Sequence, residues 1–414
     1  MDITLAAGQR VAVAVAGLFA MVAANVVVAD DWPRFLGSHY DGISRERGWN
    51  KDWPVEGPRT LWRKNVGIGA SSVAVMGDRL YTMGNRDDRD IIWCIDSATG
   101  TVLWRKEYSC KLDRRMFEGG PGATPTIADG RLFTLAHDGQ LHCWGAEDGS
   151  PLWRRDLRDD FDGRRQQWGF CGSPLVTEDK LIIDNGGRES STIALDPATG
   201  QLLWASGSDK IGYASPVVAR FGSHRVVLLM KATALVGLEL DSGQELFRHP
   251  WETGYKVNAA TAQVAGHRIF ISSGYGRGCA LLNVRDDGLE LVYENKHMAN
   301  QMDTSVIYEG HVYGISGNDN RGQLVCMALD DGCVKWTQGD TKTGTVALAD
   351  GYLIVLSEKG GLLRVGPASP DGFKPTGRAV VFKGRSWSVP VLANGRLFAK
   401  NNDGDLVALE VRTP

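Results

Sequence analysis

A short motif recurs along this chain with a period of about 45 residues, and a recurring unit of that length indicates a repeat architecture. The stretch IDSATGTVLW ends at Trp104, and ALDPATGQLLW, which ends at Trp204, repeats it. In each copy a glycine stands four residues before the aromatic residue, because a tight turn between two strands needs one residue with positive φ. The motif therefore predicts a hairpin whose second strand carries the aromatic side chain.

The number of aromatic positions gives the number of repeats. Tyr293 and Phe382 fill the aromatic position in two degenerate copies, and Trp62 marks the first unit. Consecutive positions are 42 to 51 residues apart. The eight aromatic residues are Trp62, Trp104, Trp153, Trp204, Phe247, Tyr293, Trp336 and Phe382.

A second set of turn signals gives the same count, because eight two-residue turns each precede a run rich in β-branched residues. Each period has room for four strands of about five residues, which is the size of a propeller blade. We therefore predict an all-β fold, an eight-bladed β-propeller of four-stranded antiparallel blades. The turns are Gly77-Asp78, Asp129-Gly130, Glu178-Asp179, Gly222-Ser223, Gly266-His267, Glu309-Gly310, Asp350-Gly351 and Asn394-Gly395.

The first and last units are out of phase with the others. Trp62 comes before any inner strand, while the last unit, from Trp387 to Val411, has room for only three strands. We expect the N-terminal strand Leu61-Trp62-Arg63 to complete that last blade, which removes an open sheet edge.

The N-terminus predicts export. Residues Val11 to Ala29 form an uncharged, mostly apolar run after Arg10, which is typical of a signal peptide over residues 1–29, with an uncleaved membrane anchor as the alternative. We expect no membrane span after Asp30. Residues 30–414 are expected to form one propeller domain. The predicted signal peptide places this domain in the periplasm or elsewhere outside the cytoplasm. A formal charge of -3 disfavours nucleic acid as a partner.

The repeat resembles the pyrroloquinoline-quinone-like (quinoprotein-type) propeller repeat, with its Leu-Asp, Thr-Gly and Trp positions in fixed order. The opening DWPRFLG, from Asp31, and DGIS, from Asp41, are similar to an exported bacterial branch of that family. This superfamily includes quinone-dependent alcohol dehydrogenases and the scaffold lipoprotein of outer-membrane assembly, so the resemblance implies the fold and leaves enzyme and scaffold both open.

The residues favour a binding role over redox chemistry. Quinone dehydrogenases of this superfamily commonly stack the quinone on a disulfide of two adjacent cysteines beside calcium, but no two of the seven cysteines here are adjacent. We predict no cofactor and a non-enzymatic binding or scaffold propeller for a protein, peptide or glycan. The alternative is an enzyme, a PQQ-dependent alcohol or sugar dehydrogenase with calcium, and a sugar or polymer hydrolase is a third class.

No metal site is expected at the histidines. His224, His267 and His311 recur beside the first turn of a blade, and His137 and His142 flank a second hairpin without the tight spacing of zinc ligands. Turn chemistry explains these positions without a metal ion.

The predicted functional surface is the face that carries the long blade-to-blade connections, including 105–120, 154–171, 248–258 and 294–303. Connections that enter the innermost strands ring the mouth of the central channel, where aromatic side chains can stack on a ligand and polar groups can orient it. The candidate binding residues are Arg115, Glu118, Trp168, Tyr213, Lys256, Asn258, Asp303 and Trp387.

Three cysteines yield a testable prediction. Cys94, Cys143 and Cys326 share a repeat position with Ala194 and Gly237, which indicates a small buried position. We expect these thiols to stay reduced and to react with thiol reagents only after unfolding. Mass spectrometry of alkylated native and unfolded protein measures this, and rapid labelling of any of the three in native protein would contradict the strand assignment.

Overall fold

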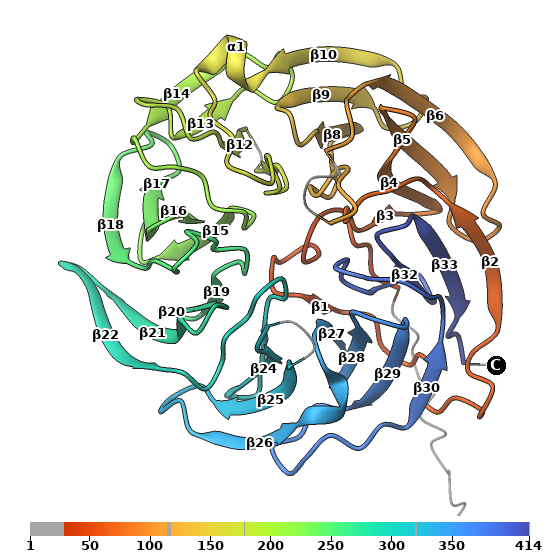
Figure 1. Cartoon of the computed structure of the whole chain (residues 1–414). Helices are drawn as coiled ribbons and strands as arrows, with labels where there is room; N and C mark the ends of the chain where they lie inside the picture. Colours follow the sequence, from red (N-terminus) through yellow and green to blue (C-terminus); the bar gives the residue numbers. More distant parts are fainter. Residues whose placement is uncertain (1–28, 114–116, 178, 319–320, 414) are drawn as a thin grey trace, which may run out of the picture.

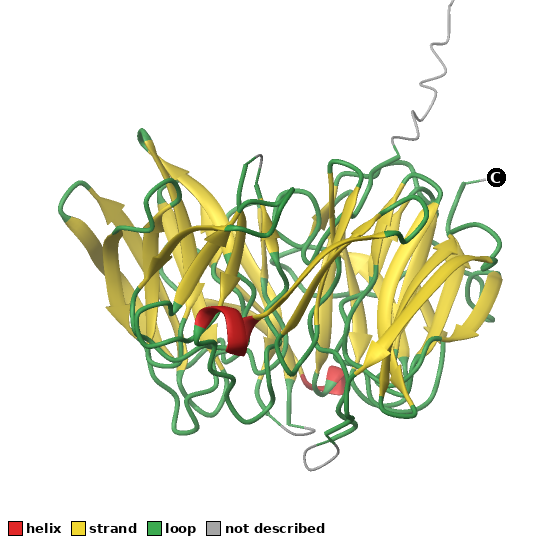
Figure 2. Cartoon of the chain, turned by 90° about the horizontal axis from the view of Figure 1, so that it is seen from above, coloured by secondary structure: helices red, strands yellow, loops and turns green. Residues whose placement is uncertain are grey.

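The computed structural model describes residues 29–113, 117–177, 179–318 and 321–413, so the expected leader lies outside the described residues except for Ala29. Eight antiparallel sheets surround a central axis, each with its first strand innermost (Figure 1). The predicted eight-bladed propeller is confirmed. Figure 2 shows the strands standing between two layers of loops.

The blades follow one another in chain order, and each runs from its inner to its outer strand. Blades 1 to 4 are β3 (Ala74–Met76), β4 (Arg79–Arg86), β5 (Arg89–Asp96), β6 (Val102–Ser109); β7 (Thr126–Ala128), β8 (Arg131–Leu135), β9 (Gln140–Gly145), β10 (Pro151–Asp156); β11 (Leu175–Val176), β12 (Leu181–Asp184), β13 (Thr192–Leu195), β14 (Leu202–Ser206); and β15 (Val217–Phe221), β16 (His224–Met230), β17 (Ala234–Glu239), β18 (Glu245–Pro250). Blades 5 to 8 are β19 (Gln263–Ala265), β20 (Arg268–Ser273), β21 (Gly278–Arg285), β22 (Gly288–Asn295); β23 (Val306–Tyr308), β24 (His311–Ser316), β25 (Gln323–Ala328), β26 (Val334–Gln338); β27 (Gly344–Ala349), β28 (Tyr352–Ser357), β29 (Leu362–Pro367), β30 (Gly377–Val380); and β31 (Val391–Ala393), β32 (Arg396–Lys400), β33 (Asp405–Glu410) with β2 (Thr60–Asn65).

Helix is nearly absent from the described residues. The short helix α1 (Leu157–Phe161) follows β10, and a 3-10 turn, η1 (Gly339–Thr341), follows β26. Within the described ranges, no helix has the length and apolar character that crossing a membrane requires.

Seven of the eight predicted turns lie between the first and second strands of a blade, and the eighth includes Glu178, which lies outside the described residues. At Asn394-Gly395 both residues have positive φ, 53° and 73°, and Asp129-Gly130 repeats this at 48° and 71°. Paired positive φ values define the hairpin turn whose twist matches that of the flanking strands, and Asn-Gly and Asp-Gly adopt it at low cost. Short local sequences therefore determine these hairpins.

The repeated tryptophan docks five of the blades onto the next one. The Trp104 indole N–H of blade 1 donates to the Ala146 carbonyl of blade 2 at 3.1 Å. A Cβ on Gly149 would lie 2.8 Å from the Trp104 ring, so this turn requires glycine for close approach as well as for its φ of 68°. The same bond joins Trp62 to Ser97, Trp153 to Pro197, Trp204 to Leu240 and Trp336 to Ser369.

One aromatic assignment is wrong. Tyr293 lies on β22 opposite Leu281, as the repeat predicts. Phe382, however, lies beyond the end of β30 and packs against Gly361. Residues 368–376 form a longer connection between β29 and β30 than the tight turn of the motif, so the Gly-to-aromatic spacing does not apply there. Trp53, from the N-terminal segment, covers Gly377 of β30 instead.

The N-terminal segment closes the propeller at its edge and also crosses its axis. β2 pairs with β33, with Trp62 opposite Ala408, so it supplies the outer strand of blade 8 as predicted. A further strand, β1 (Ile43–Ser44), pairs in parallel with β27 and makes blade 7 five-stranded, which the sequence analysis did not anticipate.

Between Trp32 and β1 the segment runs over the face of the tight first turns. Trp32 exchanges backbone hydrogen bonds with Val75 of blade 1, Pro33 accepts from Ile127 of blade 2, and the Arg34 guanidinium donates to Val176 of blade 3. The chain then reaches blade 7 through β1. Residues 32–44 therefore cover one end of the channel.

The three repeat-position cysteines are buried as expected. Cys94, Cys143 and Cys326 are each 0% exposed, and each lies opposite a tryptophan of the neighbouring strand. Burial raises the pKa of Cys326 to about 11 and that of Cys143 to about 12, so both are thiols at neutral pH.

We expect removal of residues 30–66 to give aggregated or protease-sensitive protein, because it uncovers the edge of β33 and one end of the channel. A truncated protein that stays monomeric with an unchanged melting temperature would refute this closure.

Two substitutions of different severity test the Trp62 contact. Trp62→Phe loses the hydrogen bond to Ser97 and should lower the free energy of unfolding by about 1 kcal/mol. Trp62→Ala should lower it by about 3 kcal/mol or more. Denaturant unfolding measures both changes.

Candidate functional site

A ring of hydroxyl groups lines the channel where the chain enters each innermost strand. The amide of Ser72 donates to Thr124 Oγ1 at 3.1 Å, that of Thr124 donates to Ser173 Oγ at 2.9 Å, and that of Ser173 donates to Ser215 Oγ at 2.9 Å. The series continues from Ser215 to Thr261. Blades 2 to 5 thus each accept a hydrogen bond from a backbone amide of the blade before, which fixes this part of the channel wall.

Asp303 carries this connection between blades 6 and 7. Its carboxyl group accepts from the amide of Ile315 at 2.9 Å and from the amide of Val346 at 3.0 Å. Burial raises the pKa of Asp303 to about 8, although these hydrogen bonds oppose the shift. Asp303 therefore joins two blades and does not face a ligand.

A cavity of about 170 Å³ lies in the channel beside the connections that enter the innermost strands. Phe35, from that N-terminal segment, contributes to its lining. Two edge-to-face aromatic pairs stand around it, Trp168 with Tyr213 at 5.4 Å between ring centroids and Phe117 with Trp387 at 4.7 Å. We call this space the mouth cavity.

Arg385 binds two carboxylates beside the mouth cavity. Its guanidinium donates to Glu118 Oε1 at 2.7 Å and to Glu358 Oε1 at 3.1 Å. It also lies over the rings of Phe117, at 4.9 Å, and Trp387, at 5.3 Å. These five side chains, the Arg385 cluster, combine two aromatic rings with one guanidinium shared between two carboxylates.

Two further bonds fix the orientation of the cluster. The Trp387 indole N–H donates to Glu358 Oε1 at 3.2 Å, and the Asn402 side-chain amide donates to Glu118 Oε2 at 3.1 Å. Each carboxylate therefore has at least two polar partners. The arrangement suits recognition, since neither carboxylate stands free as a general base.

Four of the candidate residues meet at the mouth cavity. Glu118, Trp168, Tyr213 and Trp387 all line it, from connections that are far apart in the sequence. Arg115 lies outside the described residues.

The other candidates lie elsewhere. Lys256 is exposed and pairs with Glu252 at 3.5 Å, outside the cavity lining. Asn258 is fully buried, and its side-chain amide donates to the carbonyls of Lys231 and Trp251, so it supports the backbone, as Asp303 does.

Sequence reasoning missed Phe117, Arg385 and Asn402. Arg385 stands two residues before the candidate Trp387 on the connection into blade 8, and this proximity in the sequence could have identified it. Phe117 is 45% exposed despite its size and has a φ of 55°, and only the folded chain shows that it covers Arg385.

The residues at the mouth cavity do not fit a quinone beside calcium. All seven cysteines are free, so the described residues offer no disulfide platform. Among the described residues, Glu118 is the only carboxylate that lines the mouth cavity, and it is paired with Arg385. The volume is also below the ~300 Å³ typical of small-molecule sites. We derive no redox step at this cavity.

A family profile described as "Outer membrane protein assembly factor BamB" matches residues 88–338. Among curated relatives, BamB of Shewanella oneidensis is 25% identical over 298 residues, which are 67% of this chain and 71% of that protein. Quinohemoprotein alcohol dehydrogenase ADH-IIG of Pseudomonas putida is 27% identical over 146 residues, 33% of this chain and only 19% of the dehydrogenase.

Solved structures show the same fold. BamB from Moraxella catarrhalis superposes with a TM-score of 0.65 at 15% identity, covering 85% of this chain and 99% of that one. Quinohemoprotein alcohol dehydrogenase from Comamonas testosteroni gives 0.67 at 13% identity, covering 93% and 81%. At such identities the likeness establishes the architecture alone.

Asp303 predicts a pH dependence of stability. Its pKa of about 8 in the folded state exceeds the ordinary 3.8, so the folded chain keeps a proton that the unfolded chain releases between these values. Stability should therefore fall as pH rises through this window, by on the order of 1 kcal/mol per pH unit from this group. Melting temperatures from about pH 5 to about pH 8 should fall less steeply in Asp303→Asn, and parallel curves would exclude Asp303 as the cause.

Proposed function

Because this chain belongs to the family described as outer membrane protein assembly factor BamB, we propose that it acts outside the cytoplasm as a non-enzymatic scaffold whose loop-rich face binds another protein. The relative from Shewanella oneidensis, matched over 71% of its length, carries that assembly name. Among the protein, peptide and glycan partners that the sequence leaves open, this relationship supports a protein.

The Arg385 cluster is the observation that carries the proposal. Phe117 leaves 45% of its surface exposed above a guanidinium that two carboxylates hold in place. Aromatic and arginine side chains dominate the binding energy of protein interfaces when they are preorganised and surrounded by polar groups. The cluster has this composition.

The cavity beside the cluster suits a partner side chain. At about 170 Å³ it has room for one or two apolar side chains and is lined by the ring faces of Trp168 and Trp387. An apolar anchor in such a pocket, ringed by polar groups, is a common centre of an interface. We therefore expect the partner to insert an apolar or aromatic residue there.

Single substitutions test the surface. Phe117→Ala and Trp387→Ala should each weaken partner binding at least tenfold, because they remove rings from the cluster. Phe117→Ala should leave the melting temperature within a few degrees, since the ring is half exposed. Partners are captured from solubilised envelope extract with each variant as bait, and the dissociation constant of the recovered protein is then measured.

Tyr255→Ala and Lys256→Ala are matched controls. Tyr255 is 72% exposed and aromatic, yet neither residue lines the mouth cavity, so both variants should bind as wild type. Equal binding by all four variants would reject the mouth cavity as the interface.

A separate measurement tests the scaffold role itself. Pyrroloquinoline quinone and calcium are added to the purified protein, which is passed through a gel-filtration column and assayed for dye reduction with alcohols. We expect no stoichiometric retention of quinone. Retention accompanied by turnover would overturn the proposed function in favour of a dehydrogenase.

A further inference from the structure

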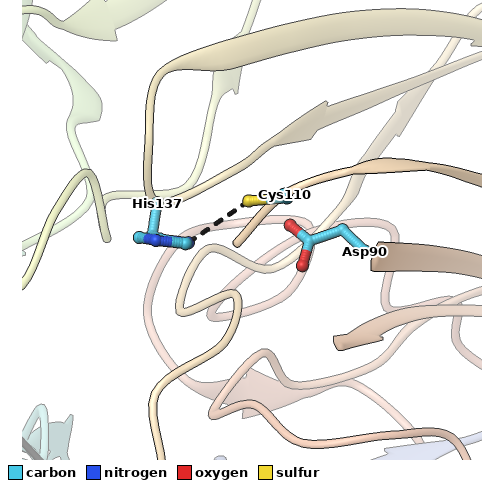
Figure 3. A group of neighbouring side chains, drawn as sticks. All are labelled: Asp90, Cys110 and His137. Carbon is cyan, nitrogen blue, oxygen red and sulfur yellow. Dashed lines mark hydrogen bonds between the residues drawn. The ribbon is translucent and has the colours of Figure 1, made fainter. Parts of the chain in front are cut away.

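Three metal-binding side chains meet at the junction of blades 1 and 2 (Figure 3). Asp90 lies on β5, Cys110 follows the end of β6, and His137 follows the end of β8. One ligand atom from each lies within 4.8 Å of the other two, and all three residues are buried. Figure 3 shows the thiol between the imidazole and the carboxylate.

The backbone holds these side chains in place. The amide of Cys110 donates to the Asp88 carbonyl at 3.0 Å, and the amide of Phe170 donates to the His137 carbonyl at 3.0 Å. The Asn85 side chain donates both to Asp90 Oδ1, at 2.7 Å, and to the Cys110 carbonyl, at 2.8 Å. The group is therefore preorganised, with its carboxylate oriented by an amide as metal-ligating carboxylates usually are.

The second carboxylate oxygen has no such support. Asp90 is 0% exposed, and among the described residues the Cys110 thiol is the one side chain that can donate to its second oxygen, Oδ2, which otherwise has no hydrogen-bond partner. Burying an unpartnered carboxylate oxygen is costly, and such an oxygen calls for a proton, a water molecule or a cation.

The spacing of the thiol and the imidazole fits a tetrahedral metal. Cys110 Sγ lies 3.5 Å from His137 Nδ1. Zinc bonds of ~2.3 Å to sulfur and ~2.0 Å to nitrogen, set at a tetrahedral angle, place those two atoms roughly 3.5 Å apart. The arrangement also differs from a Cys-His-Asp nucleophile, because the carboxylate lies on the thiol side and does not orient the imidazole.

We propose that Asp90, Cys110 and His137 bind one zinc ion that fastens the connection after β6 to blades 1 and 2. On binding, zinc displaces the Cys110 proton to solvent, so a 2+ ion meets one thiolate, one carboxylate and a neutral imidazole. The buried group then carries no net charge, which limits the cost of burial. Thiolate sulfur, imidazole nitrogen and carboxylate oxygen are all ligands that zinc binds, and three protein ligands leave the fourth tetrahedral position open.

His137 also lines a cavity beside the three side chains. Its other lining residues include Lys111, Asp113, Asp138 and Arg165. Water or a group from a partner can occupy the fourth position from this side. The site is separate from the Arg385 cluster, so its test does not depend on the proposed scaffold function.

Cobalt and zinc binding to untagged, chelator-treated, reduced protein tests the proposal. We expect one equivalent of Co²⁺ to produce the near-ultraviolet charge-transfer absorption of a cobalt–thiolate bond, and one equivalent of Zn²⁺ to abolish it. Zinc should also raise the melting temperature, because it binds the folded chain. A folded wild-type protein that shows no such band would refute the site whatever the variants do.

Variants assign the ligands. Cys110→Ser should abolish the band, and Asp90→Asn and His137→Gln should each weaken zinc binding at least tenfold. Cys171→Ser is the matched control, because this thiol lines the mouth cavity and donates to the Trp168 carbonyl, so its variant should keep full zinc binding. An unchanged band in folded Cys110→Ser, or loss of the band in Cys171→Ser, would show that zinc binds elsewhere.

Discussion

The hydrogen bond from a tryptophan indole of one blade to a turn carbonyl of the next holds the ring of blades together. Five such bonds link outer strands to the third turn of the following blade, and the turn glycine allows the indole to lie directly against the backbone. The small residue opposite each tryptophan completes the fit. A local motif thereby sets the rotation between blades, and its repetition closes the ring.

Two further sets of contacts stabilise the blades around the axis. The hydroxyl groups along the channel accept hydrogen bonds from backbone amides of the preceding blade. Residues 32–44 cover the end of the channel at the tight first turns. The connections on the opposite face contribute the hydroxyl groups and Asp303 to these contacts, and they also hold Phe117 and Arg385 in fixed positions.

The same fold occurs in relatives named for assembly and in relatives named as dehydrogenases, so the fold alone does not choose between the two roles. In this chain Glu118 and Glu358 share an ion pair with Arg385, and the cysteines are free. Such a surface is suited to docking a partner. The buried Asp90, Cys110 and His137 at the neighbouring junction add a group with different chemistry on the same face.

The sequence by itself determined the blade count, the hairpin turns, the edge closure by β2 and the burial of three cysteines, because each depends on contacts within one repeat or between adjacent repeats. Only the tertiary structure decided which side chains meet at the mouth cavity, since Glu118 and Arg385 are 267 positions apart. Asn258 and Asp303 have the polar character of ligand-binding residues, yet burial among backbone groups makes them structural. Cys110 and His137 are 27 positions apart on different blades, a spacing that no short metal-binding motif contains. Their convergence follows from the angle between two blades, which no local pattern encodes.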